Sequence, residues 1–388
     1  MITMCRSFNP VGQGAFYTES FRCEGGEKDK HVIYDCGSLQ NSSLIQSAIR
    51  GQYAKGEIIS AVFISHFDDD HINGLEYLLK YCSVKTLFLP LMQEENKALL
   101  LIKLLADGVS QHSFMYSFIV NPESVVGENT RIIHIEEYDG EDHPYESQGL
   151  FPPIDKSDDE RFATSTYMRQ TIASGTPCRL ASLDWIYVPY NYKETKRRQR
   201  MIEILTNYNI ELPKTPADVP ALYLKYESIL KECYLSLPGG INTNSMVVYS
   251  GPANPSTTDS HFHDNIGLCC DCNWKCRPRY HHRKVGCLYT GDYDASGADK
   301  WSELELCFSQ YWDIVGTLQI PHHGSKHSYN PHLSKVGINI AVVSVGSSNK
   351  YRHPHGYVVR DMLLHGVKLR IVTEASESQA NFVIRLRS

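Results

Sequence analysis

The residues best suited to chemistry lie in one short segment, SHFDDDHINGL, which spans residues 65–75. Four of its side chains offer imidazole nitrogens or carboxylate oxygens as metal ligands: His66, Asp68, Asp70 and His71. This mixture of donors suits Zn²⁺, Mn²⁺ or Fe. An acidic helix N-terminus would explain the aspartates, which complement the helix dipole, but not the flanking histidines. The segment therefore predicts a metal site.

Three further polar clusters each follow an apolar run that is typical of a strand. Their candidate residues are Asp292 in LYTGD, His322 and His323 in PHHGS, and His353 and His355 beyond INIAVVSVG. Strand ends in open α/β folds meet along one edge of a sheet, where ligands usually bind. Any one cluster could be a surface loop, but together they predict a metal site at such an edge.

The elements that must position these residues alternate between strand and helix patterns. Strands are expected at 32–36, 58–65, 84–90, 131–136, 245–250, 286–290, 315–320 and 338–345, and helices at 39–50, 72–81 and 94–106. This alternation predicts an α/β fold whose sheets are covered by helices. Two regions interrupt it: 138–177 is polar and predicts a long loop or small lobe, and 192–234 is strongly helical.

Composition narrows the class of protein. In 388 residues, 42% are hydrophobic, which supports a large core, and the net charge of −6 argues against binding nucleic acid through bulk positive charge. A local basic groove stays open as an alternative. No apolar run is long enough for a membrane helix, and the N-terminus lacks a signal-peptide pattern. The twelve scattered cysteines fit a reducing compartment. We therefore expect a cytoplasmic protein without a membrane partner.

A Cys/His-rich stretch at 251–285 is a candidate for an additional structural zinc site. Its proposed ligands are Cys269, Cys272, Cys276 and His281. The cysteine spacing is close to that of zinc ribbons and knuckles, but it lacks a clean paired repeat. The alternative is a hairpin extension with unpaired thiols.

Basic residues in two places could contact a nucleic-acid backbone. They are Lys196, Arg197, Arg198 and Arg200 in the helical region, and Arg277 and Arg279 in the Cys/His-rich stretch, which also carries aromatic residues for stacking. A basic run on a helix is more often a solvated face, and that alternative stays open.

The motifs taken together resemble the metallo-β-lactamase superfamily, and most closely the hydrolase domain of the competence protein ComEC and its stand-alone relatives. The segments that carry the resemblance appear in family order: VGQGA (11–15), VIYDCG (32–37), SHFDDDHINGL, NTNS (242–245), LYTGD, PHHGS and the stretch from Asn349 to Pro354. They cover most of the chain outside 138–235. The resemblance implies one hydrolase domain over 1–388, folded as an αββα sandwich with a mostly helical insertion at 138–235 and the Cys/His-rich loop at 251–285.

The resemblance also implies a centre with two divalent ions, Zn²⁺ or Mn²⁺, with Mg²⁺ as a further option. His66 and Asp68 would face the first ion, and Asp70 and His71 the second. Asp292 would bridge the ions, and one of His322 and His323 would complete the second position. Asp35 would orient a ligand, with a strand-end turn as the alternative.

Two departures from the superfamily pattern match the competence type. Asp68 stands where the superfamily has a histidine, and Asn242, Asn244 and Ser245 stand at the place of another metal-binding histidine. The first position is therefore poor in ligands and favours Mn²⁺ or Mg²⁺ over tightly held Zn²⁺.

The function implied by the resemblance is a dinuclear phosphodiesterase or nuclease acting on nucleic acid, plausibly DNA. Asp70 would handle a proton as well as bind metal, and His353 or His355 would contact a phosphate oxygen or protonate the leaving group. A role in genome defence, with unidentified partner proteins, rests on analogy alone. The alternatives are a metallohydrolase of a small molecule, cyclic nucleotide or peptide, and a non-catalytic binding or sensor module.

Overall fold

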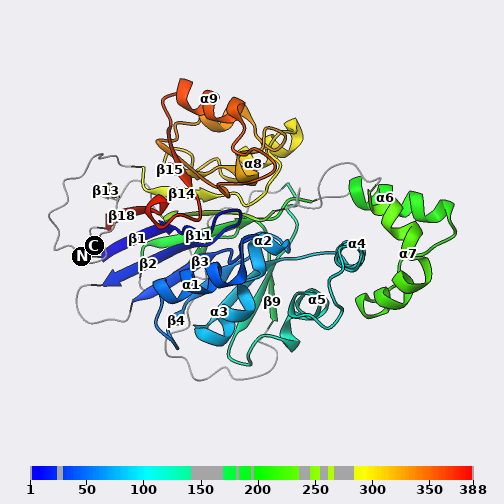
Figure 1. Cartoon of the computed structure of the whole chain (residues 1–388). Coiled ribbons are helices and arrows are strands. Elements are labelled where there is room, and N and C mark those ends of the chain that lie inside the picture. Colours follow the sequence, from blue (N-terminus) through cyan, green and yellow to red (C-terminus); the bar gives the residue numbers. More distant parts are fainter. Residues whose placement is uncertain are drawn as a thin grey trace.

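The computed structural model describes residues 2–23, 29–140, 169–180, 183–193, 196–235, 245–253, 261–265 and 284–386. In these parts of the chain, two large sheets pack face to face, and helices cover both outer sides (Figure 1). The expected α/β class and αββα layering are confirmed.

The first sheet has nine strands and contains both chain ends of the described protein. Its order is β13 (His261–Asn265), β18 (Ala380–Leu386), β1 (Ile2–Phe8), β2 (Tyr17–Cys23), β3 (Lys30–Tyr34), β5 (Ala61–Phe63), β7 (Thr86–Pro90), β8 (Arg131–Ile135) and β9 (Arg169–Ile172). The strands from β3 to β9 run parallel, so their carboxyl ends share one edge of the sheet.

The second sheet has seven strands. Its order is β10 (Cys178–Arg179), β11 (Trp185–Tyr190), β12 (Val247–Pro252), β14 (Gly286–Tyr289), β15 (Val315–Gln319), β16 (Ile340–Ser344) and β17 (Lys368–Val372). The last four are parallel, which again brings their carboxyl ends together.

Two predicted strands are each divided in the structure. The segment 58–65 forms β4 (Ile58–Ile59) and β5, and the segment 84–90 forms β6 (Ser83–Val84) and β7. β4 and β6 pair with each other in a separate small sheet, while β5 and β7 join the first sheet. The division was not predictable, because both halves of each segment are equally apolar.

Helices form the two outer layers. One core lies under α1 (Ser42–Gln52), α3 (Leu75–Tyr81), α4 (Glu94–Ala106), α5 (Phe114–Val120), α6 (Lys196–Asn207) and α7 (Val219–Leu235). The opposite core lies under α8 (Ala298–Cys307) and α9 (Gly356–Leu364). In α4, Glu94 and Glu95 lie in the first turn, where they complement the helix dipole, and Ala98 to Ile102 are buried.

The range 138–235 contains more than helices. β9, β10 and β11 fall inside it and belong to the two main sheets, whereas α6, η3 (Pro216–Asp218) and α7 lie beside α4 and α5 (Figure 1). Part of the expected polar loop is thus an edge strand, because β8 supplies the pairing that its own polar sequence does not signal. The boundaries of an insertion at 138–235 stay a prediction.

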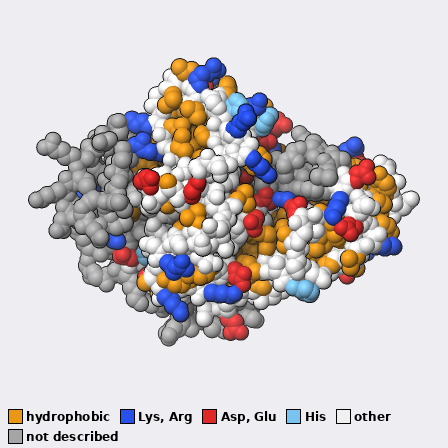
Figure 2. Space-filling model, in the orientation of Figure 1, with side chains coloured by type: hydrophobic (Ala, Val, Ile, Leu, Met, Phe, Trp, Pro, Cys, Tyr) orange, Lys and Arg blue, Asp and Glu red, His pale blue; other side chains and the backbone are white. Residues whose placement is uncertain are grey.

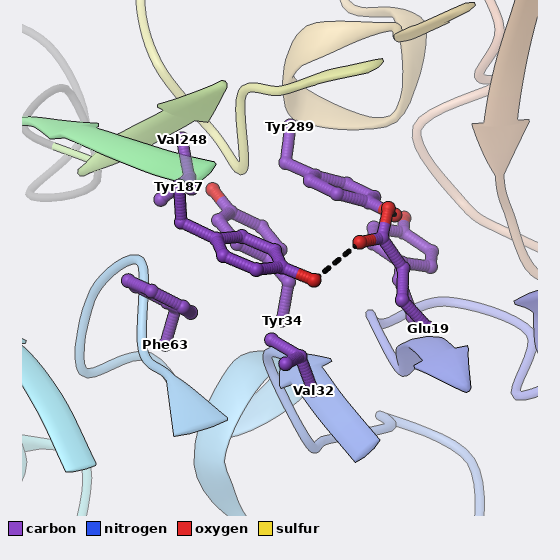
Figure 3. A pocket seen from close by; sticks show the side chains of 8 residues that line it. Glu19, Val32, Tyr34, Phe63, Tyr187, Val248 and Tyr289 are labelled. Carbon is purple, nitrogen blue, oxygen red and sulfur yellow. Dashed lines mark hydrogen bonds between the residues drawn. The ribbon is translucent and has the colours of Figure 1, made fainter. Parts of the chain in front are cut away.

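The core between the sheets contains a buried polar group, which we call the Glu19 cluster. It consists of Arg6, Glu19, Tyr187, Ser250 and Tyr289. The carboxylate of Glu19 accepts hydrogen bonds from Arg6 Nε (2.6 Å), Tyr187 Oη (2.6 Å), Ser250 Oγ (2.7 Å) and Tyr289 Oη (2.9 Å). A cavity of about 10 Å³, room for one water at most, lies among these aromatic rings (Figure 3).

Candidate metal centre

The sequence-predicted ligands lie at the carboxyl ends of strands from both sheets. Asp35 follows β3 and His66 follows β5, while α2 (Asp69–Ile72) carries Asp70 and His71. From the second sheet, Asp292 follows β14, and η5 (Pro321–Gly324) after β15 carries His322 and His323. The loops of the two sheets therefore meet at one edge of the sandwich.

Asp292 lies at the centre of this group. Its Oδ1 is 3.3 Å from His71 Nε2 and 3.7 Å from His323 Nε2. Its Oδ2 is 3.6 Å from His322 Nε2 and 3.9 Å from His66 Nε2. Four imidazoles thus face one carboxylate, with two rings on each oxygen. We call these five residues and Asp70 the Asp292 cluster.

Two sets of side chains within the cluster have ligand atoms close enough together to hold a metal ion. Among the described residues, these sets are His66, His71 and Asp292, and Asp70, His71 and His323, with all ligand atoms of a set within 4.8 Å of one another. Asp70 Oδ2 is 3.2 Å from His323 Nε2 and 3.9 Å from His71 Nε2. All members of both sets are buried.

Asp35 orients one of these imidazoles from behind. Its carboxylate accepts hydrogen bonds from Ser65 N and Ser65 Oγ, both at 2.7 Å, and lies 2.7 Å from His71 Nδ1. An ionised carboxylate only accepts, so His71 carries its proton on Nδ1. The Ser65 hydroxyl gives its own proton to Asp35, and its oxygen lies 2.8 Å from His66 Nδ1. This arrangement matches the role that the resemblance implied for Asp35.

The other rings are held at Nδ1 as well. Ser245 Oγ lies 2.9 Å from His66 Nδ1, and Ser328 Oγ lies 3.0 Å from His322 Nδ1. His323 Nδ1 donates to the backbone carbonyl of Ser344 at 2.8 Å. Partners of this kind fix the ring orientation of metal-bound histidines.

The protonation of the rings provides a test of whether this donor set fits a metal ion. With one proton on Nδ1, a neutral ring of His71 or His323 would turn a lone pair towards Asp292 Oδ1, so in a metal-free cluster this contact requires a second proton on the ring. His66 Nε2, His71 Nε2 and Asp292 Oδ1 are buried and have no hydrogen-bond partner among the described residues. A buried polar atom without a partner is costly, and a divalent cation between these atoms would satisfy them together. The donor set therefore fits a metal ion.

The electrostatics of the cluster lead to the same conclusion. Burial alone would raise the pKa of Asp292, but His322, His71 and His323 outweigh it and hold that pKa well below the usual value. Burial would also raise the pKa of Asp70, but His71 and His323 lower it to about 2. Burial would lower the pKa of His71, yet Asp292, Asp35 and Asp70 raise it well above the usual value. The carboxylates thus stay ionised, and the positive charge that balances them is a second proton on His71 in the metal-free cluster, which a bound divalent ion would replace.

Local backbone geometry helps to aim these side chains. His322 and His323 both have positive φ, 49° and 52°, and Asp35 has φ of 58°. Such conformations are uncommon for residues other than glycine and concentrate at functional sites. Gly291 also has positive φ (53°), and a Cβ there would come within 2.8 Å of the Ser65 side chain. A glycine before Asp292 therefore allows the two motif loops to pack together.

Asp68 differs from the other predicted ligands in its partner. Its Oδ1 lies 2.9 Å from Nζ of Lys103 on α4, and it belongs to neither set of clustered ligand atoms. Burial raises the pKa of Asp68, and Lys103 opposes that rise. A metal role for Asp68 stays a prediction.

The two candidate catalytic histidines near the C-terminus have different surroundings. The ring centre of His353 lies 6.2 Å from that of His322, at the border of the cluster. Burial, His322 and His323 lower the pKa of His353 to about 4, so its ring is neutral near pH 7. His355 is the N-cap of α9, and its Nδ1 accepts a hydrogen bond from Tyr357 N at 3.1 Å. Its capping contact explains the presence of His355 without catalysis, whereas His353 lies beside the candidate centre.

The other predicted contacts are mostly outside the described residues. This holds for Cys269, Cys272, Cys276, His281, Arg277 and Arg279, and for the side chains of Lys196, Arg197 and Arg198. Arg200 is exposed and pairs with Glu203 at 3.1 Å. On the face shown in Figure 2, basic and acidic side chains are interspersed. The zinc site and the nucleic-acid contacts stay predictions.

Sequence reasoning missed Lys103, Ser65 and Ser328 as neighbours of the candidate centre. Lys103 lies on α4, far from the motif in sequence, and a lone lysine in an amphipathic helix carries no signal of such a contact. Ser65 is part of the motif, but serine before a histidine is too common to predict a supporting role.

One known protein family matches part of the chain. Residues 24–87 match the metallo-β-lactamase superfamily. The matched segment contains Asp35 and the motif from His66 to His71, and the two-sheet architecture is consistent with that fold. The superfamily assignment made from the motifs is supported, and the ComEC-like subfamily stays a prediction.

Two solved structures align with most of this chain at low similarity. The human short-form tRNase Z (ELAC1) has 12% sequence identity and a TM-score of 0.37, with 89% of this chain and 92% of that chain covered. Unliganded yeast PDE1 has 9% identity and a TM-score of 0.41, with 98% and 100% covered. At these values, neither structure indicates what this chain acts on.

No curated protein matches the sequence significantly. Across the described residues, we find no helix with the length and apolar character needed to cross a membrane.

Proposed function

We propose that this protein is a metal-dependent hydrolase that cleaves phosphodiester bonds in nucleic acid, with DNA as the favoured substrate. The observation that carries the proposal is the convergence of four imidazole Nε2 atoms on Asp292, while the Nδ1 atoms are held by separate partners. Structural histidines usually have both nitrogens satisfied, whereas this arrangement leaves ligand atoms available on one side. The superfamily match over 24–87 supports the hydrolase class.

Asp70, His71, His323 and Asp292 would hold a divalent ion, with His66 on the other side of Asp292. Such an ion, when bound, activates water and polarises a phosphoryl oxygen. Asp35 keeps the proton of His71 on Nδ1, so that its Nε2 stays available. Asp70 would also accept a proton from the attacking water.

His353 would contact the substrate. Its ring lies beside His322, at the border of the cluster, and is only partly buried. We propose that it hydrogen-bonds a phosphate oxygen. A neutral ring can donate such a hydrogen bond. Protonation of the leaving group would instead require a ring that carries an additional proton near pH 7.

A hydrolase of a small molecule is the second candidate, and one cavity favours it. A space of about 360 Å³ is lined by Phe67 of the motif, Phe118 and Ile119 of α5, and Pro216 of η3, and it adjoins the metal motif through Phe67 without being lined by a residue of the Asp292 cluster. Its size lies within the usual range for small-ligand sites, and Pro216 comes from the range 138–235. A non-catalytic sensor is less favoured, because the second position has four convergent ligand atoms.

The test combines metal content with hydrolysis on one preparation. Wild type, Asp70→Ala and the control Asp69→Ala are compared by ICP-MS and on single- and double-stranded DNA and RNA with added Mn²⁺, Mg²⁺ or Zn²⁺. Asp69 is a matched control because it is the adjacent carboxylate, is exposed and bonds Asn73 at 3.1 Å. We expect metal-dependent cleavage that Asp70→Ala abolishes and Asp69→Ala retains.

Other outcomes discriminate among the candidates. Metal binding without cleavage of any nucleic acid would shift the function to the small-molecule hydrolase. Wild type that binds no metal would exclude the metal-dependent hydrolase altogether.

A further inference from the structure

Lys103 and Asp68 form an ion pair next to the candidate centre. The ammonium nitrogen is 2.9 Å from Asp68 Oδ1, and the side chains of Lys103 and Asp68 are only 19% and 12% exposed. A pair this sheltered from water is costly to desolvate, and breaking it by removing one partner is costlier still. The lysine is therefore firmly tied to a carboxylate of the metal motif.

Asp68 is the residue that would otherwise supply a ligand at the first metal position. In the structure, the His66 side of Asp292 has few other donors. His322 Nε2 approaches Asp292 Oδ2 but belongs to neither set of clustered ligand atoms. Ser245, at the place of a metal-binding histidine, already accepts from Asp292 N at 2.9 Å and lies 2.9 Å from His66 Nδ1. Of the set His66, His71 and Asp292, this position shares His71 and Asp292 with the second position, and only His66 is its own.

The second position differs in this respect. Asp70, His71 and His323 converge there within 4.8 Å, and Asp292 Oδ1 faces both histidines. These are the four donors that a tetrahedral metal ion requires. The two metal positions therefore differ in their number of ligands. The ion pair with Lys103, which holds Asp68, sets this difference.

We propose that Lys103 is a built-in cation that competes with a metal ion for Asp68. The proposal rests on the proposed metal-dependent function. At the second position, one ion binds tightly. At the first position, a further ion binds only when the Asp68 carboxylate leaves the ammonium group, so its affinity is reduced by the strength of the ion pair.

The placement of α4 supports a permanent role for this lysine. α4 packs against α5 and against η3, α6 and α7 of the range 138–235. Leu101 and Ile102, beside Lys103, are fully buried in that core. Because the helix is held from several sides, the ammonium group stays near Asp68, and a shift of α6 or α7 would change the availability of the first position.

The test measures metal stoichiometry rather than activity. Wild type, Lys103→Met and the control Lys97→Met are equilibrated with increasing Mn²⁺ by dialysis, and bound metal is counted by ICP-MS. Lys97 lies on the same helix, is comparably sheltered, and pairs with Glu94 at 2.9 Å away from the motif. Methionine keeps the apolar stem and removes the charge.

We expect wild type and Lys97→Met to bind about one Mn²⁺ tightly and a second one weakly. In Lys103→Met, the second ion should bind on the order of tenfold to a hundredfold more tightly, which is the equivalent of one hydrogen bond to a charged group. Adding Asp68→Asn to Lys103→Met should abolish the gain, because the released carboxylate is then missing. Mn²⁺ should also raise the Tm of Lys103→Met more than that of wild type.

The single variant Asp68→Asn gives an independent result in case Lys103→Met does not fold. It should keep the tight ion of wild type, because Asp68 is not a ligand while Lys103 holds it. Loss of the tight ion in Asp68→Asn, two equally tight ions in wild type, or unchanged binding in Lys103→Met would each overturn the proposal while leaving a metal-dependent hydrolase intact. Absence of Mn²⁺ binding to every variant would instead overturn the proposed function.

Discussion

The protein contains two groups of buried charged side chains, one between the sheets and one at the edge of the sandwich, and the two groups differ in how their polar atoms are satisfied. In the Glu19 cluster, four donors surround one carboxylate at 2.6–2.9 Å, and the guanidinium of Arg6 also donates to the carbonyl of Val285. Figure 3 shows Tyr187 and Tyr289 beside Glu19. In the Asp292 cluster, four imidazoles approach one carboxylate only to 3.3–3.9 Å, and ligand atoms of His66 and His71 have no hydrogen-bond partner among the described residues.

The difference separates a structural polar group from a candidate functional one. Buried polar groups are normally satisfied by hydrogen bonds, as Glu19 is. When buried donors and acceptors converge without bonding each other, the arrangement is completed by something from outside the chain. Removing a member should therefore affect stability in the first cluster and metal binding in the second.

The largest effect is expected for Glu19→Gln. It leaves the buried guanidinium of Arg6 without its counter-ion, which should lower the free energy of unfolding by about 3–5 kcal/mol. Urea denaturation of the metal-free protein measures this, with Glu76→Gln, whose side chain is 46% exposed, as control. A loss below about 1 kcal/mol would contradict the structural role of the Glu19 cluster. The Mn²⁺-dependent gain in stability should persist in the variant.

A smaller effect, confined to metal binding, is expected for Asp292→Asn. At a metal concentration of 100 times Kd, a bound ion stabilises the wild-type fold by about 2.7 kcal/mol, and this gain should disappear in the variant, because one set of ligands loses Asp292 and the other loses the carboxylate that faces His71 and His323. Thermal unfolding with and without Mn²⁺ provides the measurement. If Mn²⁺ stabilises Asp292→Asn as much as wild type, the cluster is not the metal centre.

The smallest effect is expected for Tyr289→Phe. The ring stacks on Tyr34 with centroids 5.0 Å apart, and phenylalanine preserves that contact while removing one of four donors to Glu19. The cost should be about 1 kcal/mol of unfolding free energy, with metal stoichiometry unchanged. Tyr208→Phe, at an exposed position just after α6, is the control. Altered metal binding in Tyr289→Phe would show that the two clusters are coupled.

Several strands and one helix could be predicted from the sequence alone. The segments around residues 58–65, 84–90, 286–290 and 315–320 were predicted as strands because they are continuous apolar runs, as buried parallel strands are. The helix at 94–106 was predicted with the bounds found in the structure. By contrast, β1, β2 and β18 were not predicted. Arg6 and Glu19 place charges within β1 and β2, and nothing local shows that these charges neutralise each other across neighbouring strands.

The sequence by itself determined which residue types follow which strands and the superfamily pattern that residues 24–87 carry, because ligand types and strand-to-loop patterns are written in short contiguous segments. Only the tertiary structure decided which atoms meet. Asp292 faces His66 and His71 across the two sheets, and Lys103 reaches Asp68 from a helix 35 residues further along the chain. Such pairings depend on how the sheets and helices pack. The identity of a residue and its nearest neighbours in the sequence contain no record of that packing.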